Sequence, residues 1–209
     1  MQPTVTLYFA PLACSMASRI ALHEAGIPAV FRQVNLMTKT LAAGGDYWAI
    51  NPKGQVPALA LGDGTILNEG PVVLQAIADM APDSGLAPAA ADPARRDMMM
   101  WLNMIATELH SAVFVPYMHP AAPPEARAFA LVRLEPRFNL LDAHLADRNF
   151  LMDGFTIAGA YLVTVLGWTE HCGIDLERWP ALAAYRARLR QRPSVALALA
   201  EELSLRQAA

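Results

Sequence analysis

VTLYFA, at residues 5–10, precedes the loop PLA (11–13) and the run CSMASRIALHEA (14–25), and together they predict a strand, a loop and a helix. Aromatic and β-branched residues suit a pleated, buried surface, and Pro11 lacks the N–H that a further ladder position would need. In the third segment apolar residues recur at helical spacing until Gly26, which is typical of the end of a helix. The segment therefore predicts the first half of a βαβ unit.

Cys14 lies where this helix is expected to begin. Unpaired backbone N–H groups and the positive end of the helix dipole both favour a thiolate at such a position. Most free cysteines are small buried hydrophobes, but the place at a strand-to-helix turn favours a reactive thiol here. Residues 14–17 read C-x-x-A, and the only other cysteine is the distant Cys172. We therefore expect monothiol chemistry, with neither a disulfide framework nor a Cys-rich zinc site.

The next segments extend this unit into a small mixed sheet. Residues 29–35 predict a second strand parallel to the first, because a helical crossover joins the two. Residues 36–48 predict a short helix or an irregular excursion. Two short apolar runs, 58–61 and 65–67, flank an Asp-Gly turn and predict an antiparallel hairpin. A helix from Pro71 completes the order βαβαββα.

The composition then changes to Pro, Ala, Gly and Asp, which predicts a domain linker at 82–92. No strand signal follows it, so we expect residues 1–81 to form an α/β domain and 93–209 an all-helical domain. Residues 157–168 are apolar nearly all round and predict a central buried helix.

A polar stripe crosses the first helix of the second domain. Asn103, Thr107 and His110 follow each other at spacings of four and three, beside an apolar stripe at similar spacing. Such a border between polar and apolar faces suggests the wall of a cleft. His110 is equally compatible with a satisfied interior histidine. A metal role for His110 with His119 lacks a third ligand at useful spacing, and we expect no metal site.

Size and charge narrow the function classes. The chain has 209 residues, of which 55% are hydrophobic and 17% are charged, and its formal net charge is −3. These values exclude a disordered chain and argue against nucleic acid as a partner. The run 157–168 is too short to cross a bilayer, and the N-terminus has no basic region before its apolar stretch. We expect a cytoplasmic protein with no membrane partner.

Several stretches together resemble the cytosolic glutathione transferases, most closely the bacterial beta class, which has a cysteine at the catalytic position. The resemblance covers nearly the whole chain and implies a thioredoxin-like first domain, an all-helical second domain that carries the acceptor site, and a homodimer. The resemblance rests on five stretches: CS at 14–15, NPKGQVPAL at 51–59, LNEG at 67–70, WLNMIATELH at 101–110 and FTIA at 155–158.

The resemblance also implies roles for individual residues. Cys14 and His110 would be catalytic, and Pro57 and Thr156 structural. The valine before the expected cis-proline would pair its backbone with the cysteinyl part of glutathione. Glutathione is the co-substrate, and no further cofactor is implied. The residues that would contact it are Cys14, Lys39, Val56, Glu69, Gly70, Asn103, Thr107 and His110.

The sequence departs from the family at a helix cap. Gly159 stands where the family's capping box has an aspartate after Thr156. On typical cap energies, Gly159→Asp is expected to raise stability by about 1 kcal/mol.

Three functions stay open. The first is conjugation of the glutathione thiolate to a hydrophobic electrophile. The second is thiol–disulfide exchange or reductive dehalogenation, through a mixed disulfide at Cys14. The third is a binding protein for glutathione or hydrophobic ligands with little turnover. The natural electrophile is not readable, because the sequence does not fix which way wall candidates such as Phe114, Tyr117, Met118 and Trp168 face.

Overall fold

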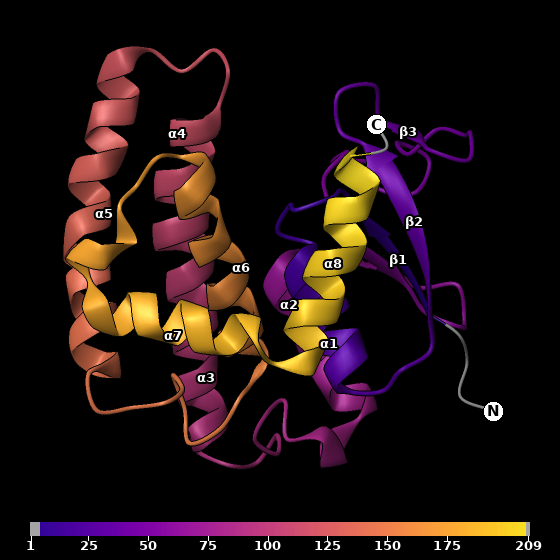
Figure 1. Cartoon of the computed structure of the whole chain (residues 1–209). Coiled ribbons are helices and arrows are strands. Elements are labelled where there is room, and N and C mark those ends of the chain that lie inside the picture. Colours follow the sequence, from indigo (N-terminus) through magenta and orange to yellow (C-terminus); the bar gives the residue numbers. More distant parts are fainter. Residues whose placement is uncertain (1–4, 208–209) are drawn as a thin grey trace. The chain divides into compact units, whose positions relative to one another are not determined.

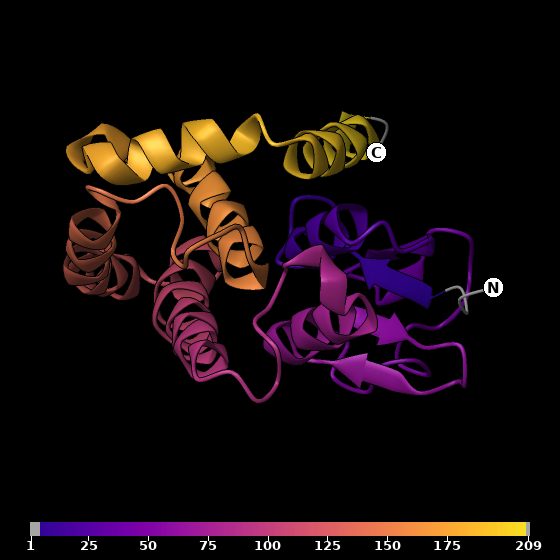
Figure 2. The same cartoon turned by 90° about the horizontal axis from the view of Figure 1, so that it is seen from below.

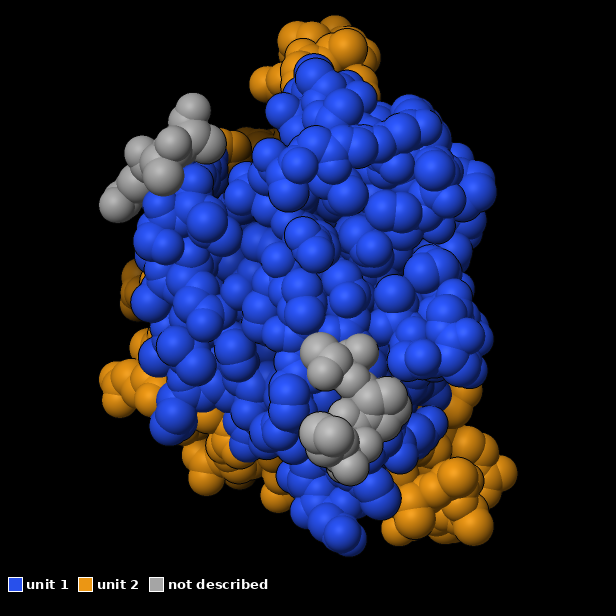
Figure 3. All heavy atoms as spheres, turned by 90° about the vertical axis from the view of Figure 1, so that its right-hand side faces the viewer, with its two compact units in different colours: residues 1–87, 193–209 blue, residues 88–192 orange. Residues whose placement is uncertain are grey.

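The computed structural model of the chain describes residues 5–207, which divide into two compact units (Figure 3). Unit 1 comprises the described parts of Met1–Ala87 and Pro193–Ala209, and unit 2 is Pro88–Arg192.

Unit 1 is a five-stranded mixed sheet covered by helices. The strand order is β3-β2-β1-β4-β5, with β1 parallel to β2 and antiparallel to β4, and with β4 antiparallel to β5. Both the parallel first pair and the antiparallel hairpin are as the sequence predicted. The elements are β1 (Val5–Phe9), α1 (Met16–Glu24), β2 (Ala29–Asn35), β3 (Thr40–Leu41), β4 (Ala58–Ala60), β5 (Ile66–Asn68), α2 (Gly70–Met80), η1 (Pro82–Ser84) and α8 (Pro193–Gln207).

Residues 36–48 do not contain the short helix that the order βαβαββα included. They form turns and the two-residue strand β3, which pairs antiparallel with β2. The side-chain oxygen of Asn35 accepts hydrogen bonds from the N–H groups of Met37 and Thr38, which turns the chain directly after β2. Gly44 and Gly45 then adopt positive φ angles of 88° and 114°, which an α-helix does not accommodate.

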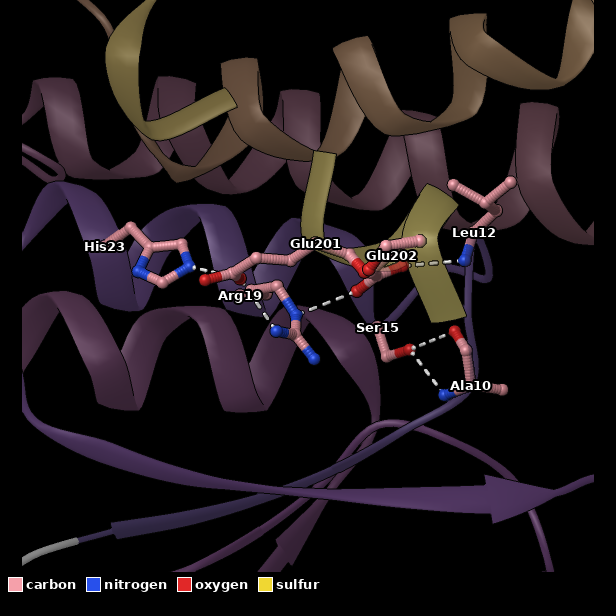
Figure 4. A network of polar contacts seen from close by, with 8 residues as sticks. Ala10, Leu12, Ser15, Arg19, His23, Glu201 and Glu202 are labelled. Atoms are coloured by element: carbon pink, nitrogen blue, oxygen red, sulfur yellow. Dashed lines mark hydrogen bonds and ion pairs between the residues drawn. The ribbon is translucent and has the colours of Figure 1, made fainter. Parts of the chain in front are cut away.

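The last helix also departs from the expected domain boundary. We expected residues 93–209 to form one helical domain, but α8 packs on α1 and belongs to unit 1 (Figures 1 and 2). Polar pairs hold α8 in this place: Arg19 and His23 of α1 contact Glu201, and Arg19 also contacts the fully buried Glu202 (Figure 4).

Unit 2 consists of helices joined by loops. Its first helix is continuous from Ala94 to Met118, with a π-helical stretch in the middle, and packs against α5 and α6 (Figure 1). By length and composition this helix could cross a membrane, a test that helices packed within soluble proteins also pass. The elements are α3 (Ala94–Asn103), η2 (Met104–Phe114), α4 (Val115–Met118), α5 (Pro124–Leu145), α6 (Ile157–His171), η3 (Leu176–Arg178) and α7 (Pro180–Arg190).

Helix α6 is buried along nearly its whole length, as its sequence predicted. Thr156 stands at its N-cap position, but the side chain makes no capping bond, and its buried hydroxyl has no protein partner. The expected capping role of Thr156 is therefore not observed. At Gly159, a Cβ atom would lie 3.2 Å from Phe155 Cδ2 and 3.2 Å from the Tyr185 hydroxyl. Both distances are shorter than an ordinary van der Waals contact, so Phe155 or Tyr185 would have to shift for an aspartate to fit.

This packing reverses the expectation for Gly159→Asp. The substitution would press on Phe155 and Tyr185 and would bury a carboxylate, so we expect stability to fall by about 1–3 kcal/mol. Gly167 is the matched control, because it lies in the same helix and a Cβ there would meet nothing within 4 Å. Gly167→Ala should raise stability by about 0.5–1 kcal/mol. Chemical denaturation of both variants is the test, and a stabilised Gly159→Asp would contradict the packing argument.

Candidate active site

The predicted site residues fall into two sets, one in each unit. Unit 1 holds Cys14, Lys39, Val56, Glu69 and Gly70, and unit 2 holds Asn103, Thr107 and His110.

Cys14 lies in the loop between β1 and α1, two residues before the helix begins. Its thiol donates a hydrogen bond to the carbonyl oxygen of Val56, with 3.1 Å between sulfur and oxygen. The Val56–Pro57 peptide bond is cis, as the resemblance implied, and Val56 directly precedes the turn into β4. Folding thus places the candidate nucleophile against the backbone step that was expected to hold glutathione.

The surroundings of Cys14 disfavour a thiolate. Burial raises the pKa of Cys14 to about 12, although the backbone N–H groups of Cys14 and Ser15 work to lower it. The negative charges of Glu202 and Glu69 add to the rise. The sequence argument considered only the helix terminus, whose effect is smaller than the cost of desolvating a thiolate. Cys14 is therefore a protonated hydrogen-bond donor at neutral pH.

Lys39 is half-buried and has a left-handed backbone with φ 58°. Its Nζ donates to the carbonyl oxygen of Gly54 at 2.8 Å and lies 5.8 Å from the centre of the Trp48 ring. A Cβ at Gly54 would come within 2.8 Å of that ring and 3.2 Å of Lys39 Cδ, so only glycine permits this packing. Lys39, one of the residues expected to contact glutathione, is thus held in place by Gly54 and Trp48.

Glu69 and Gly70 lie at the N-terminus of α2, as predicted. Glu69 has φ 70°, and its carbonyl oxygen accepts the N–H groups of Val72 and Val73. Its exposed carboxylate forms an ion pair with Lys53 Nζ. Lys53 was not predicted as a site residue, although it lies inside the run 51–59 that carries the resemblance. A lysine three residues before the predicted contact Val56 was the available signal.

In unit 2 the polar stripe is divided between two environments. Asn103 and Thr107 are exposed, and the Thr107 hydroxyl donates to the carbonyl oxygen of Asn103 at 2.8 Å. His110 packs towards α6 instead, where its Nδ1 lies 2.7 Å from the Tyr161 hydroxyl and its ring centre 5.0 Å from that of Trp168. Burial lowers the pKa of His110 to about 4, so its imidazole is neutral at physiological pH.

Some of the side chains suggested as the wall of the acceptor pocket lie in the hydrophobic core of unit 2. Phe114 is fully buried and packs edge-on against Trp168, with ring centres 5.5 Å apart. Tyr117 donates its hydroxyl to the carbonyl oxygen of Cys172. Among residues 5–207 no group of three or more His, Cys, Asp or Glu side chains is arranged to hold a metal ion.

Comparison with known proteins identifies the family. The glutathione S-transferase N-terminal domain matches residues 13–80, and the C-terminal domain of the same family matches residues 105–193. The chain is 42% identical over 197 residues to glutathione S-transferase GstA of Escherichia coli O157:H7, covering 94% of this chain and 98% of that protein.

Solved structures agree with this assignment. A sphingomonad glutathione S-transferase in complex with glutathione has TM-score 0.91 and 40% identity, over 94% of this chain and 98% of that one. The bacterial beta class glutathione S-transferase of Sphingomonas chungbukensis has TM-score 0.91 and 39% identity, over 94% and 98%. The resemblance read from the sequence is confirmed, and the chain belongs to the glutathione S-transferase family, with beta-class enzymes among its relatives.

Proposed function

We propose that this chain binds glutathione on unit 1 and directs the glutathione thiolate at an electrophilic carbon of a hydrophobic acceptor. The observation that carries the proposal is the contact between Cys14 Sγ and the Val56 carbonyl oxygen, 3.1 Å apart beside the cis peptide bond. The thiol of Cys14 and the backbone of Val56 are therefore adjacent. The cysteinyl part of glutathione would pair with Val56 as an added strand does, with its sulfur near Cys14.

The two ends of glutathione would meet charged groups of the same unit. The γ-glutamyl carboxylate fits the N-terminus of α2, where it would meet the backbone N–H of Gly70 and the positive end of the helix dipole. Its ammonium fits the Glu69 carboxylate, which Lys53 pairs with in the free chain. The glycyl carboxylate fits Lys39, whose ammonium is fixed by the Gly54 carbonyl.

We propose that Asn103, Thr107 and His110 also bind glutathione and that unit 2 supplies the hydrophobic acceptor site. Such a site accelerates transfer by holding both reactants together and by raising the thiolate fraction of glutathione. Because the thiol of Cys14 is protonated, its role in this reaction is to donate a hydrogen bond.

The second candidate is thiol–disulfide exchange or reductive dehalogenation at Cys14, which is a free thiol beside the proposed glutathione position. In the exchange, the thiolate of Cys14 attacks a mixed disulfide of glutathione with an acceptor thiol, takes over the glutathionyl sulfur and releases the acceptor thiolate. A glutathione thiolate then attacks the disulfide at Cys14, which releases oxidised glutathione and regenerates Cys14. The raised pKa of Cys14 makes this the weaker candidate, because the thiolate is the attacking form.

The deciding experiment is the initial rate of conjugation of glutathione to an activated aryl halide. The rate should saturate with glutathione and lie well above an enzyme-free control. A rate equal to the control, with glutathione still bound by calorimetry, would refute the transferase proposal. It would leave exchange at Cys14 or a carrier role.

We also propose that the chain acts in the cytoplasm and forms a homodimer, and the dimer is supported by an apolar stripe along α5. Phe129, Val132 and Leu140 are 61%, 69% and 56% exposed and follow one another at helical spacing. Contiguous exposed apolar side chains mark interaction surfaces, and a two-fold dimer would cover the same stripe on both copies.

Val132→Glu should therefore shift the protein from dimer to monomer in sedimentation velocity, because a charge would be buried in the contact. The control is Leu203→Glu, at an exposed position of α8 with 42% exposure. It should leave the mass unchanged. A Val132→Glu variant that stays dimeric would exclude the α5 stripe from the interface.

A further inference from the structure

Tyr161 holds one edge of the imidazole of His110. Its hydroxyl oxygen lies 2.7 Å from Nδ1, and the two rings meet edge to face with centres 6.0 Å apart. Trp168, on the same helix α6, lies against the His110 ring with centres 5.0 Å apart. The ring is therefore fixed in direction by two residues of one buried helix.

The chemistry of the pair decides which nitrogen carries the proton. Burial lowers the pKa of His110 to about 4, so the ring is neutral and has a single N–H. A phenol is a stronger acid than a neutral imidazole, and an imidazole nitrogen is a stronger base than a phenol oxygen. The favoured arrangement is thus Tyr161 O–H donating to Nδ1, which leaves the proton of His110 on Nε2.

We propose that Tyr161 is a positioning residue, which keeps His110 in the Nε2–H form so that it presents a neutral hydrogen-bond donor to the glutathione sulfur. This proposal rests on the proposed function, which puts His110 at the ligand. A fixed donor stabilises a sulfur that gains negative charge, and it needs no reorganisation when the reaction occurs. Because burial lowers the pKa of His110 to about 4, the imidazole stays neutral and the donor persists across the physiological range.

Two variants separate this role from general packing. Tyr161→Phe keeps the ring and removes the hydroxyl that contacts His110. The matched control is Tyr185→Phe, because Tyr185 is also buried in unit 2 and its hydroxyl has no protein partner among the residues described.

The first measurement is ¹⁵N NMR of histidine-labelled protein near neutral pH, with the His110 signals assigned by their loss in His110→Gln. In the wild type and in Tyr185→Phe, Nε2 should give the signal of a protonated nitrogen and Nδ1 that of a bare one. Tyr161→Phe should show a mixture of both forms or the Nδ1–H form. An Nδ1–H imidazole in the wild type, or an unchanged tautomer in Tyr161→Phe, would overturn the proposal.

The second measurement is conjugation kinetics. Tyr161→Phe should lower kcat by about 3- to 10-fold, the loss expected for one hydrogen bond, while KM for glutathione changes by less than about twofold. Tyr185→Phe should not change kcat. A changed tautomer with unchanged kcat would remove His110 from the sulfur and refute the positioning role. The expected tautomer in a wild type without any conjugation would instead refute the proposed function alone, because the NMR result does not depend on turnover.

Discussion

Replacement of Cys14 by alanine should abolish formation of a mixed disulfide with oxidised glutathione and leave conjugation within about tenfold of the wild-type rate. The first effect is complete because the sulfur that lies against Val56 is removed. The second is small because the attacking sulfur belongs to glutathione, and alanine removes one hydrogen bond worth about 1 kcal/mol. Intact-protein mass spectrometry after exposure to oxidised glutathione measures the first effect, and the aryl halide assay the second.

The matched control for this variant is Cys172→Ala, at the other free cysteine. It should keep both activities. Conjugation that disappears in Cys14→Ala would show that the protein thiol takes part in the transfer. A mixed disulfide that persists in Cys14→Ala would show that Cys172 is the modified residue.

The pH dependence of the exchange follows from the same thiol. Since burial raises the pKa of Cys14 to about 12, the thiolate fraction should increase about tenfold for each pH unit above neutrality. The rate of mixed-disulfide formation should therefore still be rising at pH 9. A plateau close to pH 7 would mean that the thiol is activated after all.

The local elements were predictable because their signals are local. The strand and helix around Cys14 depend on side-chain types and a proline, and the hairpin at Gly62–Gly64 depends on an Asp-Gly turn between apolar runs. The start of α2 at Gly70 followed from Pro71 in the first turn.

The features that the sequence did not reveal are contacts between residues that lie far apart in the sequence. The helix α8 belongs to unit 1 because of contacts between residues 182 and 183 positions apart, Arg19 with Glu201 and with Glu202. The ion pair of Glu69 with Lys53 and the contact of His110 with Tyr161 are of the same kind. In each case a residue's chemistry was visible, but its partner was not. A hydroxyl inside the apolar run 157–168 was the one hint of Tyr161.

The thiol of Cys14 shows the limit on electrostatic prediction. The helix terminus was read correctly from the sequence, and its N–H groups do lower the pKa. The opposing desolvation depends on how closely β1, α1 and the Val56 turn enclose the sulfur, which is a property of the folded unit. Burial raises the pKa of Cys14 by more than the helix terminus lowers it, so Cys14 is a thiol and not the predicted thiolate.

Glu202→Ala should lower the melting temperature by about 6–20 °C, the largest stability effect that we expect from a single substitution outside the site. The Glu202 carboxylate is fully buried. It accepts a hydrogen bond from Arg19 Nε at 3.0 Å and another from the backbone N–H of Leu12 at 2.6 Å (Figure 4). Its removal leaves a buried guanidinium and a backbone N–H of the Cys14 loop without these acceptors. Breaking such a buried pair costs about 3–5 kcal/mol, which corresponds to this shift for a chain of this size. Leu203→Ala, on the exposed side of the same helix, should change the melting temperature by less than about 2 °C.

The neutral variant Glu202→Gln extends this test to pH, because Glu202 and its neighbour Glu201 titrate in opposite directions. Burial raises the pKa of Glu202 from its ordinary value of 4.5 to about 7. The folded state therefore retains a proton that the unfolded state has lost, and wild-type stability relative to Glu202→Gln should fall as pH rises from about 4.5 to 7.

For Glu201 burial acts to raise the pKa, but hydrogen bonds from Arg19 and His23 lower it overall. Wild-type stability relative to Glu201→Gln should thus be complete above pH 4.5 and be lost as pH falls below it. Melting curves of the three proteins from pH 4 to 8 measure both differences, and two differences of the same sign would contradict the assignment of Glu202 as the desolvated member of the pair.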